Sequence, residues 1–103
     1  MNKIIARYTT PAITYKPSAV EVGSVDEIYL VIKQNEIEII RKGKADAVTD
    51  ENGFTWFLEQ TDTAKLNSWA PSVVQIDYTA GAARYTTCPR FYTITESAIN
   101  EVI

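Results

Sequence analysis

Short segments of strand length, separated by turn signals, constrain the fold of this chain more than any other feature of its sequence. In the clearest of them, Val74, Ile76 and Tyr78 alternate with neighbours that are mostly more polar, a period of two that fits a half-buried strand. Glycine, proline and asparagine interrupt such segments about every 8–12 residues, which is typical of sandwiches and barrels of short strands. The expected strands are residues 3–8, 12–15, 19–22, 27–33, 36–42, 45–49, 54–59, 73–78, 83–88 and 90–95.

Side-chain branching favours strands over helices. Isoleucine, valine and threonine make up 32 of the 103 residues, whereas leucine occurs three times. A branched Cβ restricts χ1 rotation in a helix but suits a pleated sheet. We therefore expect one all-β domain over residues 1–103, an antiparallel sandwich with one short helical turn near residues 61–66, capped by Thr61 or Asp62. Residues 96–103 fit either a strand or a short helix.

Three features of the composition narrow the expected function. The chain lacks histidine, so neither Ser-His-Asp nor Cys-His catalysis is expected, and the commonest metal ligand is missing. Cys88 is the only cysteine; it cannot close an intrachain disulfide, and we expect it to be a small buried residue. The net charge of −3 disfavours nucleic acid as a partner. We expect a protein that is not an enzyme and uses no cofactor.

Two further patterns bear on metals and membranes. The acidic residues Asp46, Asp50 and Glu51 offer oxygen ligands, but they lack the alternating spacing of a calcium-binding EF-hand loop, so we expect a solvated turn and no metal. No apolar run is long enough for a membrane span or a signal peptide, which predicts no membrane partner and a protein that begins in the cytoplasm of the cell that makes it.

Several short motifs occur in an order that resembles a known family. They are residues 28–34 (IYLVIKQ), 58–66 (LEQTDTAKL), 73–76 (VVQI), Gly81 and 101–103 (EVI). From Asp26 onward this order resembles small structural proteins encoded by tailed phages and prophages of Gram-positive bacteria, which are immunoglobulin-like β-sandwiches akin to the amino-terminal domain of baseplate upper proteins. The resemblance implies a virion protein of the tail, baseplate or neck, assembled in the bacterial host cytoplasm, whose partners are itself, as a homo-oligomer, or other virion proteins.

Five residues are the candidates for an interface. Residues 27–33 are apolar on both faces, so Tyr29 and Val31 lie either on an assembly surface or under covering loops. Trp69 precedes a bend at Pro71 and is a candidate interface anchor, because tryptophan is enriched at binding hot spots. Arg41 and Lys42 belong to a basic cluster that is either a solvated strand end or a contact to an acidic neighbouring subunit.

A carbohydrate-binding or host-surface-binding sandwich is the alternative function. It requires aromatic rings exposed together in one groove, and the residues that would supply them are Trp69 with Tyr8, Tyr85 or Tyr92. The other tryptophan, Trp56, is expected in the core, because it alternates in phase with its apolar neighbours.

Overall fold

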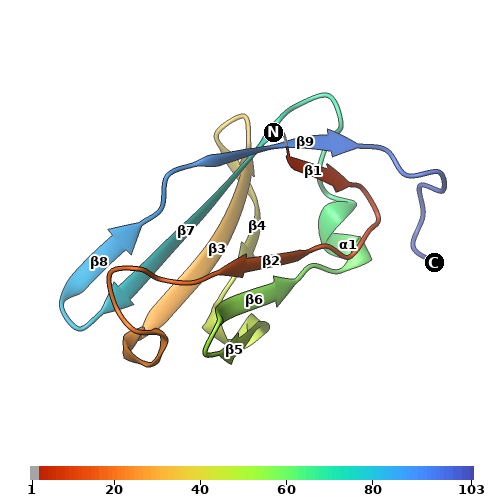
Figure 1. Ribbon diagram of the computed structural model, residues 1–103. Coiled ribbons are helices and arrows are strands. Elements are labelled where there is room, and N and C mark those ends of the chain that lie inside the picture. Colours follow the sequence, from red (N-terminus) through yellow and green to blue (C-terminus); the bar gives the residue numbers. More distant parts are fainter. Residues whose placement is uncertain (1–2) are drawn as a thin grey trace.

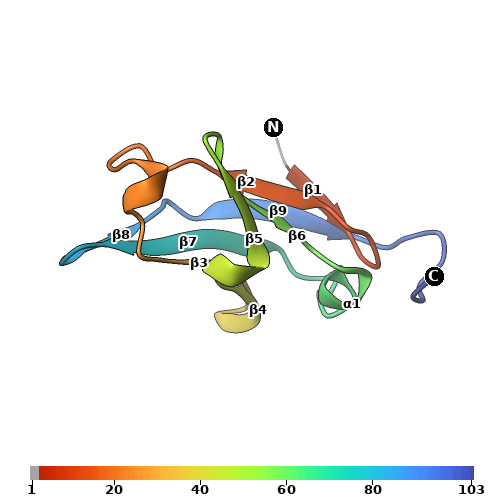
Figure 2. The same ribbon diagram turned by 90° about the horizontal axis from the view of Figure 1, so that it is seen from below.

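Two β-sheets pack face to face in the computed structural model, which describes residues 3–103 (Figure 1 and Figure 2). The larger sheet has the strand order β1-β9-β7-β3-β4, with β8 also paired to β7, and the smaller sheet has the order β2-β6-β5. The strands are β1 (Lys3–Ala6), β2 (Ala12–Tyr15), β3 (Glu27–Gln34), β4 (Ile37–Lys42), β5 (Ala47–Asp50), β6 (Gly53–Phe57), β7 (Ser72–Ala80), β8 (Ala83–Thr86) and β9 (Arg90–Thr95). The all-β prediction is confirmed.

The division of strands between the sheets is that of an immunoglobulin-like sandwich. The second, sixth and fifth strands form one sheet, as B, E and D do, and the third, fourth, seventh and ninth lie in the other, as C, C′, F and G do. One pairing departs from the antiparallel prediction, because β1 runs parallel to β9 with Ile5 opposite Ile94. Strand β1 therefore forms one edge of the larger sheet, beside β9.

The core lies between the two sheets. Buried residues alternate with more exposed ones along the strands, as the sequence predicts. On β3, Ile28, Leu30 and Ile32 are fully buried, and the paired β7 buries Val74, Ile76 and Tyr78. The smaller sheet contributes Phe54 and Trp56 from β6. The indole N–H of Trp56 donates to the carbonyl oxygen of Gly43 at 2.9 Å, which satisfies the one polar atom that this side chain brings into the core.

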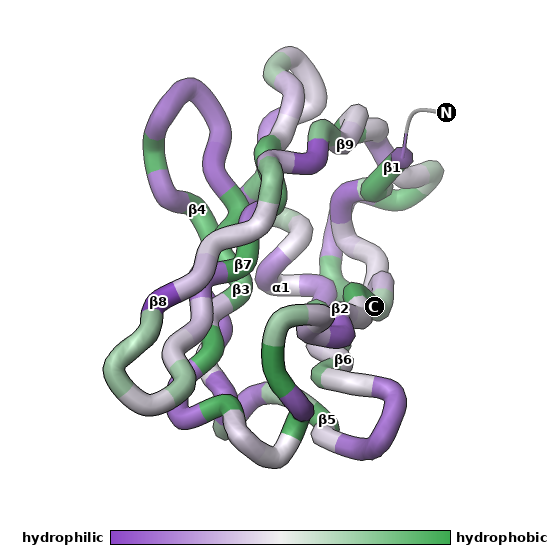
Figure 3. Tube along the Cα trace, turned by 60° about the vertical axis from the view of Figure 1, so that its left-hand side comes forward, coloured by the Kyte–Doolittle hydropathy of each residue, from purple (hydrophilic) through white to green (hydrophobic). Residues whose placement is uncertain are grey.

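The β3–β4 hairpin forms as predicted, but its turn lies one residue later than the sequence indicated. Asn35 and Glu36 both have positive φ angles, 51° and 67°, and Gln34 pairs with Ile37 across the turn. This is the geometry of a two-residue turn whose twist matches the strands that it joins. Figure 3 shows the hydrophilic tip that this hairpin projects.

The single cysteine is exposed, so the prediction of a buried Cys88 is wrong. Strand β7 pairs with β9 along its first residues and with β8 along its last ones. The strand is interrupted between β8 and β9 at residues 87–89, because proline has no backbone N–H to donate to the sheet. At this break Thr87 still exchanges hydrogen bonds with Ile76, and the side chain of Cys88 is left outside the core.

Helical structure is confined to short turns. Helix α1 (Gln60–Thr63) begins one residue before the predicted turn, and Leu66 beyond it is fully buried. The N-cap is Glu59, not Thr61 or Asp62; the Asp62 carboxylate instead accepts a hydrogen bond from the Glu59 backbone N–H at 2.9 Å.

Three further strand predictions require correction. Residues 19–22 form no strand, because Pro17 and Gly23 bracket them and the chain turns into the 3-10 helix η1 (Val22–Ser24). The 3-10 helix η2 (Lys44–Asp46) takes the start of the predicted strand 45–49, which begins at Ala47. Residues 96–103 carry neither of the regular elements predicted for them. Within residues 3–103, no helix has the length and apolar character needed to cross a membrane.

Candidate interaction surface

The outer face of the larger sheet, which the smaller sheet does not cover, brings three of the five predicted interface residues together. Tyr29 and Val31 point to this face because the residues between and beside them, Ile28 and Leu30, point into the core. Val31 lies opposite Arg41 on β4, so that Arg41 belongs to the same face. All three line one shallow depression of about 290 Å³.

Charged groups form the rim of this depression. Asp77 of β7 lies opposite Tyr29, and its carboxylate accepts hydrogen bonds from the Thr86 hydroxyl and, at 3.0 Å, from the Arg84 guanidinium. The bond from Thr86 has the largest effect on the pKa of Asp77, and together with Arg84 it lowers this pKa despite partial burial. The group is therefore an ionised surface carboxylate, which can anchor a cationic partner side chain but cannot donate a proton near neutral pH.

Arg41 is held over the depression by two neighbours. Its guanidinium donates to the Glu38 carboxylate at 2.7 and 3.0 Å and lies 5.9 Å from the centre of the Tyr29 ring. The hydrogen bond that Arg41 donates to Glu38 raises the pKa of Arg41 above its already high value. A cation fixed beside an aromatic ring suits recognition of a carboxylate next to an apolar group.

Lys42 lies on the opposite face of β4 from Arg41, so the structure separates these two predicted interface residues. The Lys42 ammonium forms an ion pair of 3.0 Å with the buried carboxylate of Asp62. Burial alone would raise the pKa of Asp62, but the hydrogen bond from the Glu59 backbone N–H and the Lys42 charge outweigh it and lower this pKa. Lys42 therefore fastens α1 to the edge of the larger sheet.

Trp69 lies in the loop between α1 and β7, with 74% of its surface exposed. The buried side chain of Gln34 fixes this loop: its amide donates to the carbonyl oxygens of Asn67 and Ala70 and accepts from the Asn67 N–H. The loop leads directly into Ser72, at the end of the sheet where Val73 pairs with Lys33. Trp69 is thus presented at one end of the larger sheet, outside the depression around Tyr29.

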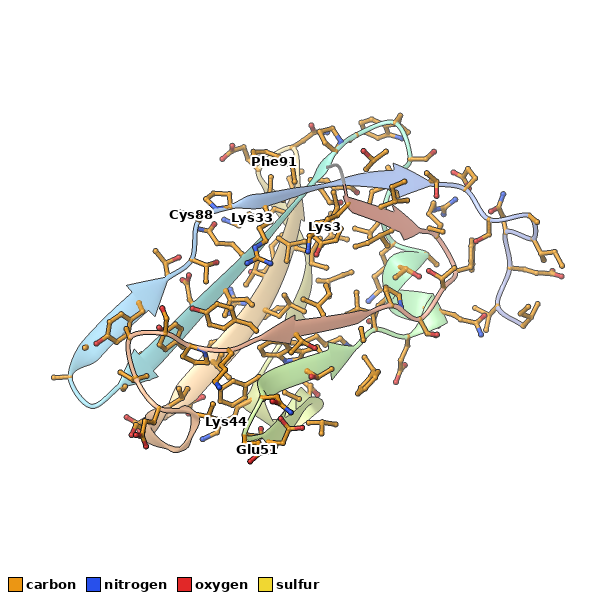
Figure 4. The ribbon with its side chains drawn as sticks, viewed as in Figure 1. Lys3, Lys33, Lys44, Glu51, Cys88 and Phe91 are labelled. Atoms are coloured by element: carbon orange, nitrogen blue, oxygen red, sulfur yellow. The ribbon has the colours of Figure 1, made fainter. Side chains whose placement is uncertain are left out.

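Two exposed apolar residues of the outer face, Ile4 and Phe91, were not predicted as interface residues. Phe91 is 66% exposed and lies opposite Val73, and Ile4 is 62% exposed on the neighbouring strand β1. In Figure 4, Phe91 and Lys33 lie in the upper half of the molecule, away from Lys44 and Glu51 near β5. The signal was present in the sequence, because Phe91 is out of phase along the strand with Tyr92 and Ile94, which face the core.

The remaining candidate ligands have structural roles. Asp46 accepts a hydrogen bond from the Gly43 N–H, and Asp50 accepts one from the Asn52 N–H, both within their own turns. Within residues 3–103, no group of three or more acidic or cysteine side chains is arranged to hold a metal ion.

Within residues 3–103, none of the aromatic ring pairs includes Trp69, and the three tyrosines proposed for a carbohydrate groove make other contacts. Tyr85 stacks on the buried ring of Tyr78, with 4.9 Å between ring centres, and Tyr92 is half-buried against the core. Tyr8 lies beside Arg7, whose guanidinium is 5.2 Å from its ring.

Comparison with known proteins identifies no relative of this chain. No protein-family model, curated protein or solved structure matches the chain.

Proposed function

We propose that this chain is a non-enzymatic structural protein of a phage or prophage virion, acting by self-association or by docking to tail, baseplate or neck proteins. The observation that carries the proposal is the outer face of the larger sheet. There Ile4, Phe91 and Tyr29 expose apolar surface in one layer, with the half-buried Val31 and Val73 between them. Exposed apolar surface rimmed by polar groups is typical of protein–protein interfaces.

The arrangement explains how such an interface would work. The apolar side chains lie on successive strands, so a flat partner surface can cover them together and exclude water from them. The ion pairs Arg41–Glu38 and Arg84–Asp77 lie around the depression and leave both signs of charge at the rim. Rim charges contribute little affinity but select the partner and fix its orientation.

Self-association is tested by size-exclusion chromatography with light scattering, which measures the molar mass over a series of protein concentrations. The native chain is expected to form a species larger than one chain. The variant Phe91→Ser is expected to weaken association about tenfold, as for a hot-spot side chain. The matched control is Val48→Ser, which removes a similarly exposed apolar residue from the other sheet.

A native chain that stays monomeric at the highest concentration would exclude self-association, and equal effects of the two variants would exclude the outer face as its site. Docking to other virion proteins is tested separately, by the genes that flank this one. Neighbours that encode capsid, portal or tail proteins are expected, and a neighbourhood of unrelated metabolic genes would contradict a virion role.

A further inference from the structure

A second surface, separate from the outer face, already holds a peptide segment. A shallow depression of about 610 Å³ lies where β6 leads into α1, and Val102 forms part of its wall. Its other lining residues come from the body of the domain: Thr10, Phe57, Leu58, Glu59, Gln60 and Thr61. Figure 1 and Figure 2 both show the C-terminal segment turning back beside α1 to reach this place.

The side chain of Gln60 binds this segment in the way that a neighbouring strand would. Its amide nitrogen donates to the carbonyl oxygen of Ile103 at 2.8 Å, and its amide oxygen accepts from the Ile103 N–H at 2.8 Å. The pair of bonds binds the peptide backbone, and Val102 lines the same depression as Phe57 and Leu58. Backbone bonds combined with an apolar pocket are the means by which proteins recognise extended peptides.

The segment is tied to the body of its own chain at two points. At one end Ser97 donates its hydroxyl hydrogen to the carbonyl oxygen of Arg7, and at the other Ile103 meets Gln60. The hydrogen bonds within residues 3–103 include none from residues 98–102 to the domain. Docked on its own chain, the segment also leaves Val102 56% and Ile103 80% exposed.

We propose that the segment 98–103 is exchanged between copies of this chain, so that the segment of one copy occupies the Phe57–Gln60 depression of the next. The contacts that the segment makes within one chain can be made equally between two chains, so exchange costs little once copies are concentrated. The depression and the segment are different patches, so their contact is head-to-tail and builds rings or chains of subunits.

The test uses two single-thiol proteins in which Cys88 is replaced by serine, a change at an exposed site. One carries Thr61→Cys in the depression and the other Val102→Cys in the segment. They are mixed and treated with a short bismaleimide crosslinker, and mass spectrometry identifies chains joined between positions 61 and 102. Exchange holds these two positions close together in different chains and so favours this product.

The control for random collision replaces Thr61→Cys by Thr49→Cys, an exposed position on β5. Exchange predicts a 61–102 product that increases with concentration and exceeds the 49–102 product. Equal yields of the two products, or no 61–102 product at the highest concentration, would overturn the proposal.

A second variant tests the role of the amide. Gln60→Glu on the Thr61→Cys chain places a carboxylate against the Ile103 carbonyl, and we expect the crosslinked yield to fall about tenfold. Asn52→Asp adds the same charge in a distant turn and is expected to leave the yield unchanged. An unchanged yield with Gln60→Glu would contradict the assigned recognition. The same crosslinking in a Phe91→Ser background separates this inference from the proposed role of the outer face, because exchange does not depend on Phe91.

Discussion

The ammonium of Lys42 and the carboxylate of Asp62 lie 3.0 Å apart and join the edge strand β4 to helix α1. Because the pKa of Asp62 is lowered in the folded protein, its ionised form stabilises the fold above the unfolded-state pKa of about 3.9. This contribution is lost as the pH falls through the lower, folded-state pKa. We expect the free energy of unfolding to decrease in that acidic range.

The variant Asp62→Asn tests this relationship, since asparagine keeps an oxygen acceptor for the Glu59 N–H but cannot titrate. Urea unfolding measured between neutral pH and about pH 3 should show a smaller acid-induced loss for the variant than for the native chain. The carboxyl groups of Asp77 and Glu96 also have lowered pKa values, so part of the loss should remain. Parallel pH profiles for the two proteins would contradict the assignment.

Gln34 is expected to be one of the most important polar residues for stability. It is 3% exposed and makes three hydrogen bonds to the backbone of Asn67 and Ala70. Gln34→Leu preserves the volume but leaves these backbone groups without their partner, and we expect a loss of about 2–3 kcal/mol in urea unfolding. The control Gln75→Leu removes a half-buried amide from the solvent-facing side of β7 and should cost less than about 1 kcal/mol. Similar costs for both variants would contradict the anchoring role of Gln34.

Gly53 holds the start of β6 close to β2. Its φ is +116°, and a Cβ atom would lie 2.3 Å from the carbonyl oxygen of Tyr15. We expect Gly53→Ala to destabilise the fold by more than about 2 kcal/mol, because neither the backbone angle nor the neighbouring strand can accommodate the methyl group. Gly23→Ala, where no atom lies within 4 Å of the added Cβ, should change stability by less than about 0.5 kcal/mol. Thermal unfolding of both variants gives the comparison, and equal melting temperatures would refute it.

The β3–β4 turn offers a stabilising change. Glu36 has a φ of 67°, a left-handed conformation that costs a side chain about 1 kcal/mol, whereas asparagine followed by glycine is the preferred pair for such a turn. Glu36→Gly is therefore expected to raise the free energy of unfolding by up to about 1 kcal/mol. Glu38→Gly, within β4, is expected to lower it, since glycine weakens a strand. A loss of stability in Glu36→Gly would contradict the turn geometry.

The local parts of this fold could be predicted from the sequence because they depend on alternation and turn residues. The period of two around Ile76 assigned the buried face of β7, and the β5–β6 turn lies in the predicted break between strands 45–49 and 54–59. The outer-face positions of Tyr29 and Val31 follow from the same alternation.

Two of the errors concern relationships between distant residues, and a third concerns a local interruption of strand pairing. The parallel pairing of β1 with β9 has no local signature, since its partners are nearly the whole chain apart. Lys42 was assigned to the surface because its partner Asp62 is twenty positions away and belongs to another element. Cys88 was predicted to be buried from apolar neighbours in sequence, but Pro89 interrupts pairing there and leaves the thiol exposed.

The pairing of β1 with β9 also has a consequence for synthesis. During synthesis β1 leaves the ribosome well before β9, the strand that completes its hydrogen bonds. Until residues 90–95 appear, Ile5 has no Ile94 to pack beside, and the apolar first strand stays available to other chains. Closing so large a loop is slow, because its entropic cost precedes any gain from the contact. The edge of the larger sheet should therefore be the last part of the domain to form and the part most dependent on chaperones.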